Sequence, residues 1–287
     1  MTEIHDRLRH RFFALYDGIV AFHDWCGLRY LSAEADDVRL VMPFLPRLSG
    51  SDGAIAPAMT FALADVAAGQ AAAAAFGWRT QVATVSLQQA VLAPIPKGAA
   101  LLAFARARPV QGDFVLTEIT ISAKDAPHVP LVLAQGRMIA VRRVELNENE
   151  APPIPPRADF SIDPLSGPAG MVSEIRADVL VGRLAFRPQF MGNASRGALH
   201  GGLIAAALHT AAERFGGHLV RPLSLLDGTV DFLASGRPGD LAVTIHAERT
   251  GNRVAFVSGR VEQDRPGGGE RVLVARLNAV LGLRGAP

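Results

Sequence analysis

The feature that most constrains the fold of this chain is that its two halves follow the same plan. Each half contains an alanine-rich apolar segment with the pattern of a buried helix, at 54–76 in the first half and 199–215 in the second. Each helix is followed by four segments rich in Val, Ile, Leu and Thr, separated by turns that contain Gly, Pro, Asp or Asn. The repeat predicts two similar domains.

The order of elements within each half predicts the fold class. Room for one or two short strands precedes each helix, within 29–45 and 172–186, and four strands follow it. This order suits an antiparallel sheet curled around one helix, and the lack of strand–helix alternation argues against a Rossmann-type fold. The predicted class is α+β. The four longer strands are expected at 81–93, 100–108, 114–123 and 130–144, and again at 223–233, 241–250, 254–262 and 270–283.

A proline-rich stretch divides the chain. Six prolines lie between 145 and 170, and such a stretch forms a semi-rigid connector rather than a helix or a central strand. We therefore expect four parts. Residues 1–27 are an N-terminal helical part, in which the helix itself spans 1–25. A first domain at 28–145, a linker at 146–168 and a second domain at 169–287 follow.

Composition excludes several classes of protein. The 287 residues carry 29 Lys and Arg against 27 Asp and Glu, a net charge of +2, and no basic run with interleaved aromatics suggests a nucleic-acid partner. The single cysteine, Cys26, excludes an intramolecular disulfide and a cysteine-built zinc site. Charges at the start of the chain do not suit a signal peptide, and Asp65 interrupts the most membrane-like stretch. We expect a soluble, cytoplasmic protein without membrane partners.

One motif connects this plan to a known family. The second-half helix opens with Asn193-Ala-Ser-Arg-Gly-Ala-Leu-His200-Gly201-Gly202. This resembles the hotdog-fold thioesterases of the PaaI-like type. Their pattern is an Asn, a Gly and then His-Gly-Gly at the central helix, an Asp or Glu nine residues after the His, and a Thr or Ser on the next strand. The resemblance covers 28–145 and 169–284, and it implies two tandem hotdog domains, each an antiparallel sheet wrapped around a central helix.

Neither half carries the whole pattern. Nine residues after His200 stands His209 rather than a carboxylate. The first half has the carboxylate, Asp65, but Ala56 and Pro57 stand where His-Gly would be, at an offset of 200 − 56 = 144. Each half therefore lacks a part that the other retains.

Backbone chemistry says which part matters. A helix N-terminus offers free N–H groups and a partial positive charge, so the N–H of Gly201 is a natural oxyanion donor. Its counterpart Pro57 has no N–H. Active sites of the resembling family lie between two hotdog units, which implies one complete site, with Gly201 facing Asp65. The other, inactive site would pair Pro57 with His209.

The resemblance implies roles for individual residues. Asp65 would act as general base on water, with direct attack on the thioester as the variant. His200 would hold the loop, Thr84 would orient the water, and Asn193 would hold the carbonyl or the water. Arg253 would contact the coenzyme A phosphates, although a solvated turn arginine explains it as well. The candidate catalytic residues are Asp65, Thr84, Asn193, His200, Gly201 and Gly202.

The function expected from these residues is hydrolysis of an acyl-CoA thioester with an apolar acyl group. No cofactor or metal is expected, because coenzyme A is part of the substrate, and a homodimer of double-hotdog chains is the expected assembly. Two alternatives remain. A hotdog enoyl-CoA hydratase or dehydratase would use an Asp/His pair, so a His close to Asp65 would favour it. A non-catalytic acyl-CoA binding protein would bind tightly without turnover.

Overall fold

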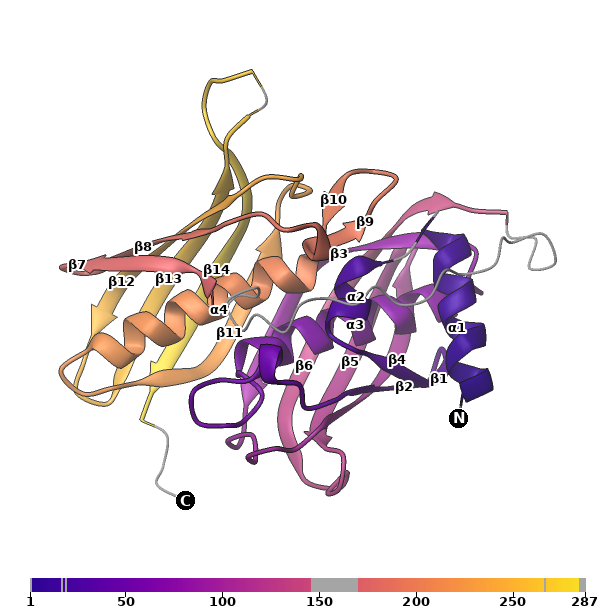
Figure 1. The fold of residues 1–287 in the computed structure, drawn as a ribbon, viewed down its shortest axis with the longest axis horizontal. Coiled ribbons are helices and arrows are strands. Elements are labelled where there is room, and N and C mark those ends of the chain that lie inside the picture. The colour runs from indigo at the N-terminus through magenta and orange to yellow at the C-terminus, as the bar shows by residue number, and fades with distance from the viewer. Residues whose placement is uncertain (1, 17, 19, 146–169, 266, 284–287) are drawn as a thin grey trace.

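The strands of the two halves join into one continuous sheet. The computed structural model describes residues 2–16, 18, 20–145, 170–265 and 267–283, so the expected linker at 146–168 lies outside the described residues. Twelve strands follow one another in the order β1-β2-β4-β5-β6-β3-β11-β14-β13-β12-β8-β7 (Figure 1). All neighbouring strands are antiparallel.

Each half contributes six of these strands. The first half supplies β1 (Arg29–Glu34), β2 (Asp37–Met42), β3 (Thr80–Val91), β4 (Leu101–Gln111), β5 (Phe114–Ala123) and β6 (Pro130–Arg143). The second half supplies β7 (Val172–Arg176), β8 (Val179–Leu184), β11 (Ser224–Phe232), β12 (Leu241–Thr250), β13 (Val254–Gln263) and β14 (Val272–Gly282). A separate two-stranded ribbon joins β9 (Met191–Asn193) and β10 (Ala198–Leu199), and short 3-10 turns lie at Pro46–Leu48 and Pro188–Phe190.

The halves meet at the β3–β11 pair. Gln88 of β3 lies opposite Thr229 of β11, and Ser86 lies opposite Asp231. Because each half ends its own sheet at this strand, the pairing leaves no open edge between the repeats. The chain thus forms internally the sheet-to-sheet contact between hotdog units, and the predicted α+β class with two tandem hotdog domains is confirmed.

One long helix lies against the sheet in each half, α3 (Ala58–Ala75) and α4 (Gly201–His218) (Figure 1). Fifteen of the 18 residues of α3 are buried, so the helix is apolar all round because sheet and helix enclose it on every side. The helix begins directly after Pro57, four residues later than expected, and α4 ends three residues later than expected.

The length and apolarity of α3 would suffice for a membrane span. By composition alone α3 passes that test, but 83% of the stretch is buried inside the protein. Burial under the sheet therefore accounts for its apolar composition.

The N-terminal segment differs from the expectation. A single helix over 1–25 is wrong: the structure has α1 (Thr2–Leu15) and the short α2 (Ala21–Trp25). The reason lies at Gly18, whose φ of +150° is a conformation that residues other than glycine rarely adopt and that no helix contains. The break turns α2 back toward the start of α4, where it contacts β9.

Candidate active site

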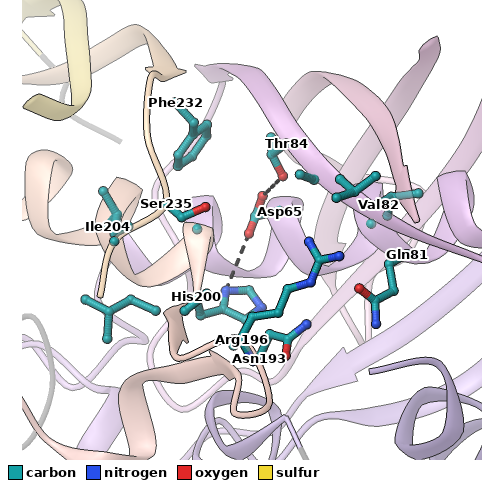
Figure 2. Close-up of a pocket in the computed structure, with 18 of the residues that line it drawn as sticks. Asp65, Gln81, Val82, Thr84, Asn193, Arg196, His200, Ile204, Phe232 and Ser235 are labelled. Atoms are coloured by element: carbon teal, nitrogen blue, oxygen red, sulfur yellow. Dashed lines mark hydrogen bonds and ion pairs between the residues drawn. The ribbon is translucent and has the colours of Figure 1, made fainter. Parts of the chain in front are cut away.

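A cavity of about 390 Å³ lies where the two halves meet. First-half residues from α3 and β3 form one wall, and second-half residues from the β9–β10 ribbon, α4 and the segment after β11 form the other. Figure 2 labels ten of the lining residues: Asp65, Gln81, Val82, Thr84, Asn193, Arg196, His200, Ile204, Phe232 and Ser235.

Asp65 is the buried carboxylate of this cavity, with 6% of its surface exposed. It lies in the second turn of α3, and its Oδ1 accepts a hydrogen bond of 2.6 Å from Oγ1 of Thr84 on β3. The other oxygen, Oδ2, faces the second half and lies 3.4 Å from Nδ1 of His200. Thr84 therefore fixes one carboxylate oxygen and leaves the other directed toward the start of α4 (Figure 2).

Gly201, the first residue of α4, lies directly against this carboxylate. A Cβ at this position would lie 3.1 Å from Oδ2 of Asp65 and 3.4 Å from a ring carbon of Phe232, so a side chain would push the carboxylate aside. The N–H of Gly201 has no hydrogen-bond partner among the described residues. An unfilled donor at a helix N-terminus favours a negatively charged oxygen.

Gly202 serves the packing of the two central helices. A Cβ at Gly202 would lie 2.9 Å from Cα and 3.1 Å from the carbonyl oxygen of Ala62 in α3. These are backbone atoms that cannot move independently of the helix. Glycine at this position lets α4 approach α3 closely enough for Gly201 to reach Asp65.

His200 caps α4 with its side chain. The N–H of Gly202 donates a hydrogen bond of 3.0 Å to Nδ1 of His200, so Nδ1 is an acceptor and the ring proton is on Nε2. Burial lowers the pKa of His200, and Asp65 opposes this shift only in part. The histidine is therefore neutral, and it presents a lone pair rather than a proton toward Asp65.

Asn193 lies in the cavity wall, but its oxygen serves its own loop. Oδ1 of Asn193 accepts hydrogen bonds from Oγ of Ser195, at 2.9 Å, and from the N–H of Arg196, at 3.1 Å. Its amide nitrogen has no partner among the described residues. Asn193 can therefore meet a ligand only as a donor.

Arg253 does not line this cavity. It lies in the turn between β12 and β13. The next residue, Val254, pairs with Gly282 of β14, and Gly282 pairs with Ser224, the first residue of β11, so this turn lies at the beginning of β11. The cavity lies beyond the other end of β11, at Phe232, roughly 26 Å away at about 3.3 Å per residue. Arg253 therefore belongs to the opposite end of the strand from the candidate site.

Besides Ser235, the cavity wall has four polar residues that were not predicted from the sequence. Arg196 is exposed, and its side chain extends across the cavity in front of His200 (Figure 2). Gln81 is buried and donates to the Leu15 carbonyl oxygen at 2.7 Å, while its own oxygen has no partner among the described residues. Tyr16 and His23 come from the N-terminal segment. Arg196 lies inside the quoted motif and could have been noticed, whereas nothing local marks the other three.

Burial and charge set the ionisation of Tyr16. Desolvation, with a smaller effect from the Asp65 carboxylate, raises the pKa of Tyr16 to about 12. The phenol therefore stays protonated at neutral pH and adds no charge to the cavity.

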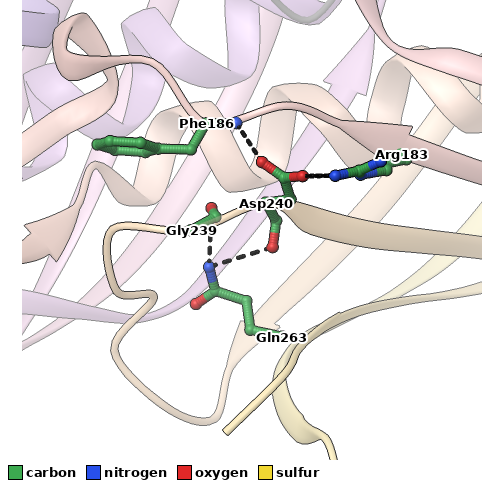
Figure 3. A network of polar contacts seen from close by, with 5 residues as sticks. All are labelled: Arg183, Phe186, Gly239, Asp240 and Gln263. Carbon is green, nitrogen blue, oxygen red and sulfur yellow. Dashed lines mark hydrogen bonds and ion pairs between the residues drawn. The ribbon is translucent and has the colours of Figure 1, made fainter. Parts of the chain in front are cut away.

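A polar network holds the segment after β11 that closes one side of the cavity (Figure 3). The amide of Gln263 accepts from the N–H of Arg237 at 2.8 Å and donates to the Gly239 carbonyl at 3.1 Å. Asp240 accepts from the N–H of Phe186 at 2.7 Å, which lowers the pKa of this carboxyl, and pairs with Arg183. The segment is thus fixed at its far end.

The corresponding place at the start of α3 is occupied by the protein itself. The hydroxyl of Thr60 donates to the Pro57 carbonyl oxygen at 2.7 Å and accepts from the buried amide of Gln89 at 2.8 Å. His209 is fully buried, with its ring 5.4 Å from that of Phe61. Side-chain packing there contrasts with the cavity beside Asp65.

Metal ligands do not cluster in the described part of the chain. Within residues 2–16, 18, 20–145, 170–265 and 267–283, no group of three or more His, Cys, Asp or Glu side chains could hold a metal ion. The polar groups beside the Asp65 carboxylate are the Thr84 hydroxyl, the neutral His200 and the unfilled N–H of Gly201.

The second repeat resembles a known protein domain. Residues 191–282 match the family described as the acyl-CoA thioesterase N-terminal domain, so a domain that stands first in that family stands second here. No protein of the curated set matches the sequence.

Solved structures match nearly the whole chain. A tesB protein of Mycobacterium avium subspecies paratuberculosis is 15% identical, with a TM-score of 0.60 over 88% of this chain and 94% of that one. An acyl-CoA thioesterase II of Mycobacterium marinum is 14% identical, with a TM-score of 0.54 over 92% and 97%. A hot dog fold protein from Alicyclobacillus acidocaldarius is 17% identical, with a TM-score of 0.56 over 93% and 98%. Residues 191–282 therefore match an acyl-CoA thioesterase domain, and the solved structures share the tandem hotdog fold with nearly the whole chain.

Proposed function

We propose that this protein hydrolyses acyl-CoA thioesters at one composite site per chain, in the cavity between its two repeats. The observation that carries the proposal is the meeting of Asp65 from the first repeat with the start of α4 from the second. Each contributes what the other repeat lacks. The other pairing, Pro57 with His209, has neither an N–H donor nor a carboxylate.

The proposed reaction is attack of water on the thioester carbonyl. Asp65 Oδ2 takes a proton from the water, the water oxygen bonds to the carbonyl carbon, and the carbonyl oxygen gains negative charge. The N–H of Gly201 donates a hydrogen bond to this oxygen. In other enzymes, removal of one such donor lowers the rate by a factor on the order of 10²–10³. Collapse of the intermediate breaks the carbon–sulfur bond, and the protonated Asp65 returns its proton to the leaving thiolate, which gives the carboxylic acid and the free thiol. No cofactor enters this scheme.

The substrate would span the mouth of the cavity. Val66, Ile204 and Phe232 supply apolar surface for an acyl group. The coenzyme A phosphates would contact Arg196 instead of Arg253, because Arg196 lies at the cavity and Arg253 does not. We place this activity in the cytoplasm, and we propose a homodimer of double-hotdog chains as its assembly.

A hydratase is the second candidate, because His200 Nδ1 lies close to Asp65. The hydrogen bond from Gly202 argues against it, since a histidine that accepts at Nδ1 cannot donate that proton to the carboxylate or to a substrate. A hydratase would need the opposite tautomer.

One set of assays separates the candidates. A panel of saturated and enoyl acyl-CoA substrates is incubated with the protein, and thiol release and enoyl absorbance are followed in parallel. Thiol release supports the proposal. Loss of the enoyl chromophore without thiol release supports the hydratase, and tight binding without either supports a non-catalytic binding protein.

A further inference from the structure

The N-terminal segment reaches the cap of α4 through two buried histidines. Nε2 of His23, in α2, lies 3.0 Å from Nε2 of His200, and the ring of Phe22 stacks on that of His200 at 4.5 Å. An ion pair of 2.8 Å between Arg9 of α1 and Asp24 of α2 holds the two N-terminal helices together. A segment outside both hotdog sheets thus touches the residue that starts the catalytic helix.

The hydrogen bonds around these rings form one directed chain. Gly202 N–H donates to His200 Nδ1, so the proton of His200 is on Nε2 and must be donated to His23 Nε2. The proton of His23 is then on Nδ1 and is donated to the hydroxyl oxygen of Tyr30, at 2.8 Å. Each nitrogen of the two rings has one role in this arrangement.

The reverse arrangement would give the site different chemistry. The Tyr30 hydroxyl would donate to His23, His23 would donate to His200, and Nδ1 of His200 would carry a proton facing Oδ2 of Asp65. Gly202 N–H would then lose its acceptor, and the carboxylate would be engaged by an imidazole proton instead of being available to water. The tautomer of His200 therefore decides whether Asp65 is a free base or half of an Asp/His pair.

We propose that His23 is a positioning residue that selects the Nε2–H tautomer of His200. It supplies the acceptor for that proton in a largely buried place, where the exposed fraction is 8% for His23 and 9% for His200. If the Nε2–H of His200 had no acceptor, the free-energy cost would be about as large as the stabilisation from the hydrogen bond between Gly202 N–H and His200 Nδ1. Burial and the nearness of His200 lower the pKa of His23, so a second proton does not enter the pair at neutral pH. The catalytic consequence rests on the proposed thioesterase function, whereas the tautomer itself does not.

Three variants of the full chain test the proposal. His23→Leu removes the acceptor, and His23→Gln keeps one. Trp25→Phe is the control, because Trp25 is buried in the same helix and makes no hydrogen bond with His200. Ring nitrogen chemical shifts from ¹⁵N NMR report the tautomer of His200, with its signals assigned from their loss in His200→Gln. Thiol release gives kcat and KM.

We expect the Nε2–H tautomer in the wild type, in His23→Gln and in Trp25→Phe, and a mixture with the Nδ1–H tautomer in His23→Leu. The kcat of His23→Leu should fall by about tenfold at unchanged KM, and His23→Gln should recover most of it. An unchanged tautomer and kcat in His23→Leu overturns the proposal.

An Nδ1–H tautomer in the wild type also overturns it, and that measurement decides even if His23→Leu does not fold. If the wild type shows no thiol release, the thioesterase proposal fails while the spectra still test the role of His23.

Discussion

Asp65 Oδ2 and His200 Nδ1 lie 3.4 Å apart, although one belongs to the first repeat and the other to the second. The distance alone resembles an acid–base pair. The hydrogen bond from Gly202 to the same nitrogen shows instead that His200 acts as a helix cap. Asp65 therefore faces the start of a helix, where an unfilled N–H adjoins a carboxylate, and this arrangement suits the activation of water beside a developing oxyanion.

Replacing the carboxylate should abolish most of the activity. Asp65→Asn keeps the shape and the hydrogen bond with Thr84 but cannot accept a proton from water. We expect kcat to fall by about 10²–10⁴, the usual contribution of a general base, with an unchanged circular dichroism spectrum. The matched control is Asp231→Asn, an aspartate of β11 that pairs with Arg276 on the surface, which should retain full activity. Full thioesterase activity in Asp65→Asn would refute the role of this residue.

A substitution at the position equivalent to Asp65 in the second repeat should have little effect on activity. His209→Asn alters the residue at that position, so we expect kcat/KM per folded molecule to stay within about twofold, while Gly201→Ala, which crowds Asp65, should lower it by at least about tenfold. Calorimetric titration with a non-hydrolysable thioether analogue of acyl-CoA should give one binding site per chain. Two equivalent sites per chain would contradict the composite arrangement.

Acid should destabilise the fold before the carboxylates titrate. Burial holds the pKa values of His23 and His200 below their ordinary value of 6.5. Above that pH both histidines are neutral in the folded and unfolded states, and their contribution is fully present. As pH falls from 6.5 toward the lowered pKa values, the unfolded chain takes up protons that the folded protein does not. The free energy of unfolding should then fall by at most about 1.4 kcal/mol per pH unit for each histidine.

Urea denaturation measured between about pH 7.5 and pH 5 tests this dependence. His23→Gln removes one of the two histidines and should reduce the slope. A stability that does not change between pH 6.5 and 5 would show that these histidines are not held neutral.

The turn that ends in Asp240 should support the cavity from a distance. Gln263→Leu removes the side-chain hydrogen bonds to the backbone of Arg237 and Gly239, and we expect a loss of about 1–2 kcal/mol of unfolding free energy. KM should rise more than kcat falls, because the wall formed by Ser235 loosens while Asp65 stays in place. Thermal denaturation and steady-state kinetics measure both, and Arg271→Gln, which changes only a surface ion pair with Asp264, is the control.

Much of the fold could be predicted because it depends on local patterns. The alanine-rich helix, the strands with their turns and the repeat at an offset of 144 residues are visible in the sequence. Asp65 and Gly201 were identifiable because an unpaired acid in an apolar helix and a glycine at a helix start have few structural explanations. Two features could not be predicted in this way: the position of Arg253 and the break of the N-terminal helix. Long-range pairing decides at which end of the sheet the Arg253 turn lies and in which direction the chain continues after Gly18.

By itself the sequence determined that neither repeat could supply a complete site, because Pro57 has no N–H to donate and His209 is no carboxylate. Only the tertiary structure decided how the remaining parts meet. Pairing of β3 with β11 and the close approach of α4 to α3 at Gly202 set Asp65 against Gly201. The contact between His23 and His200 joins residues far apart in the chain, and a hydrogen bond between two buried rings leaves no periodicity in a sequence.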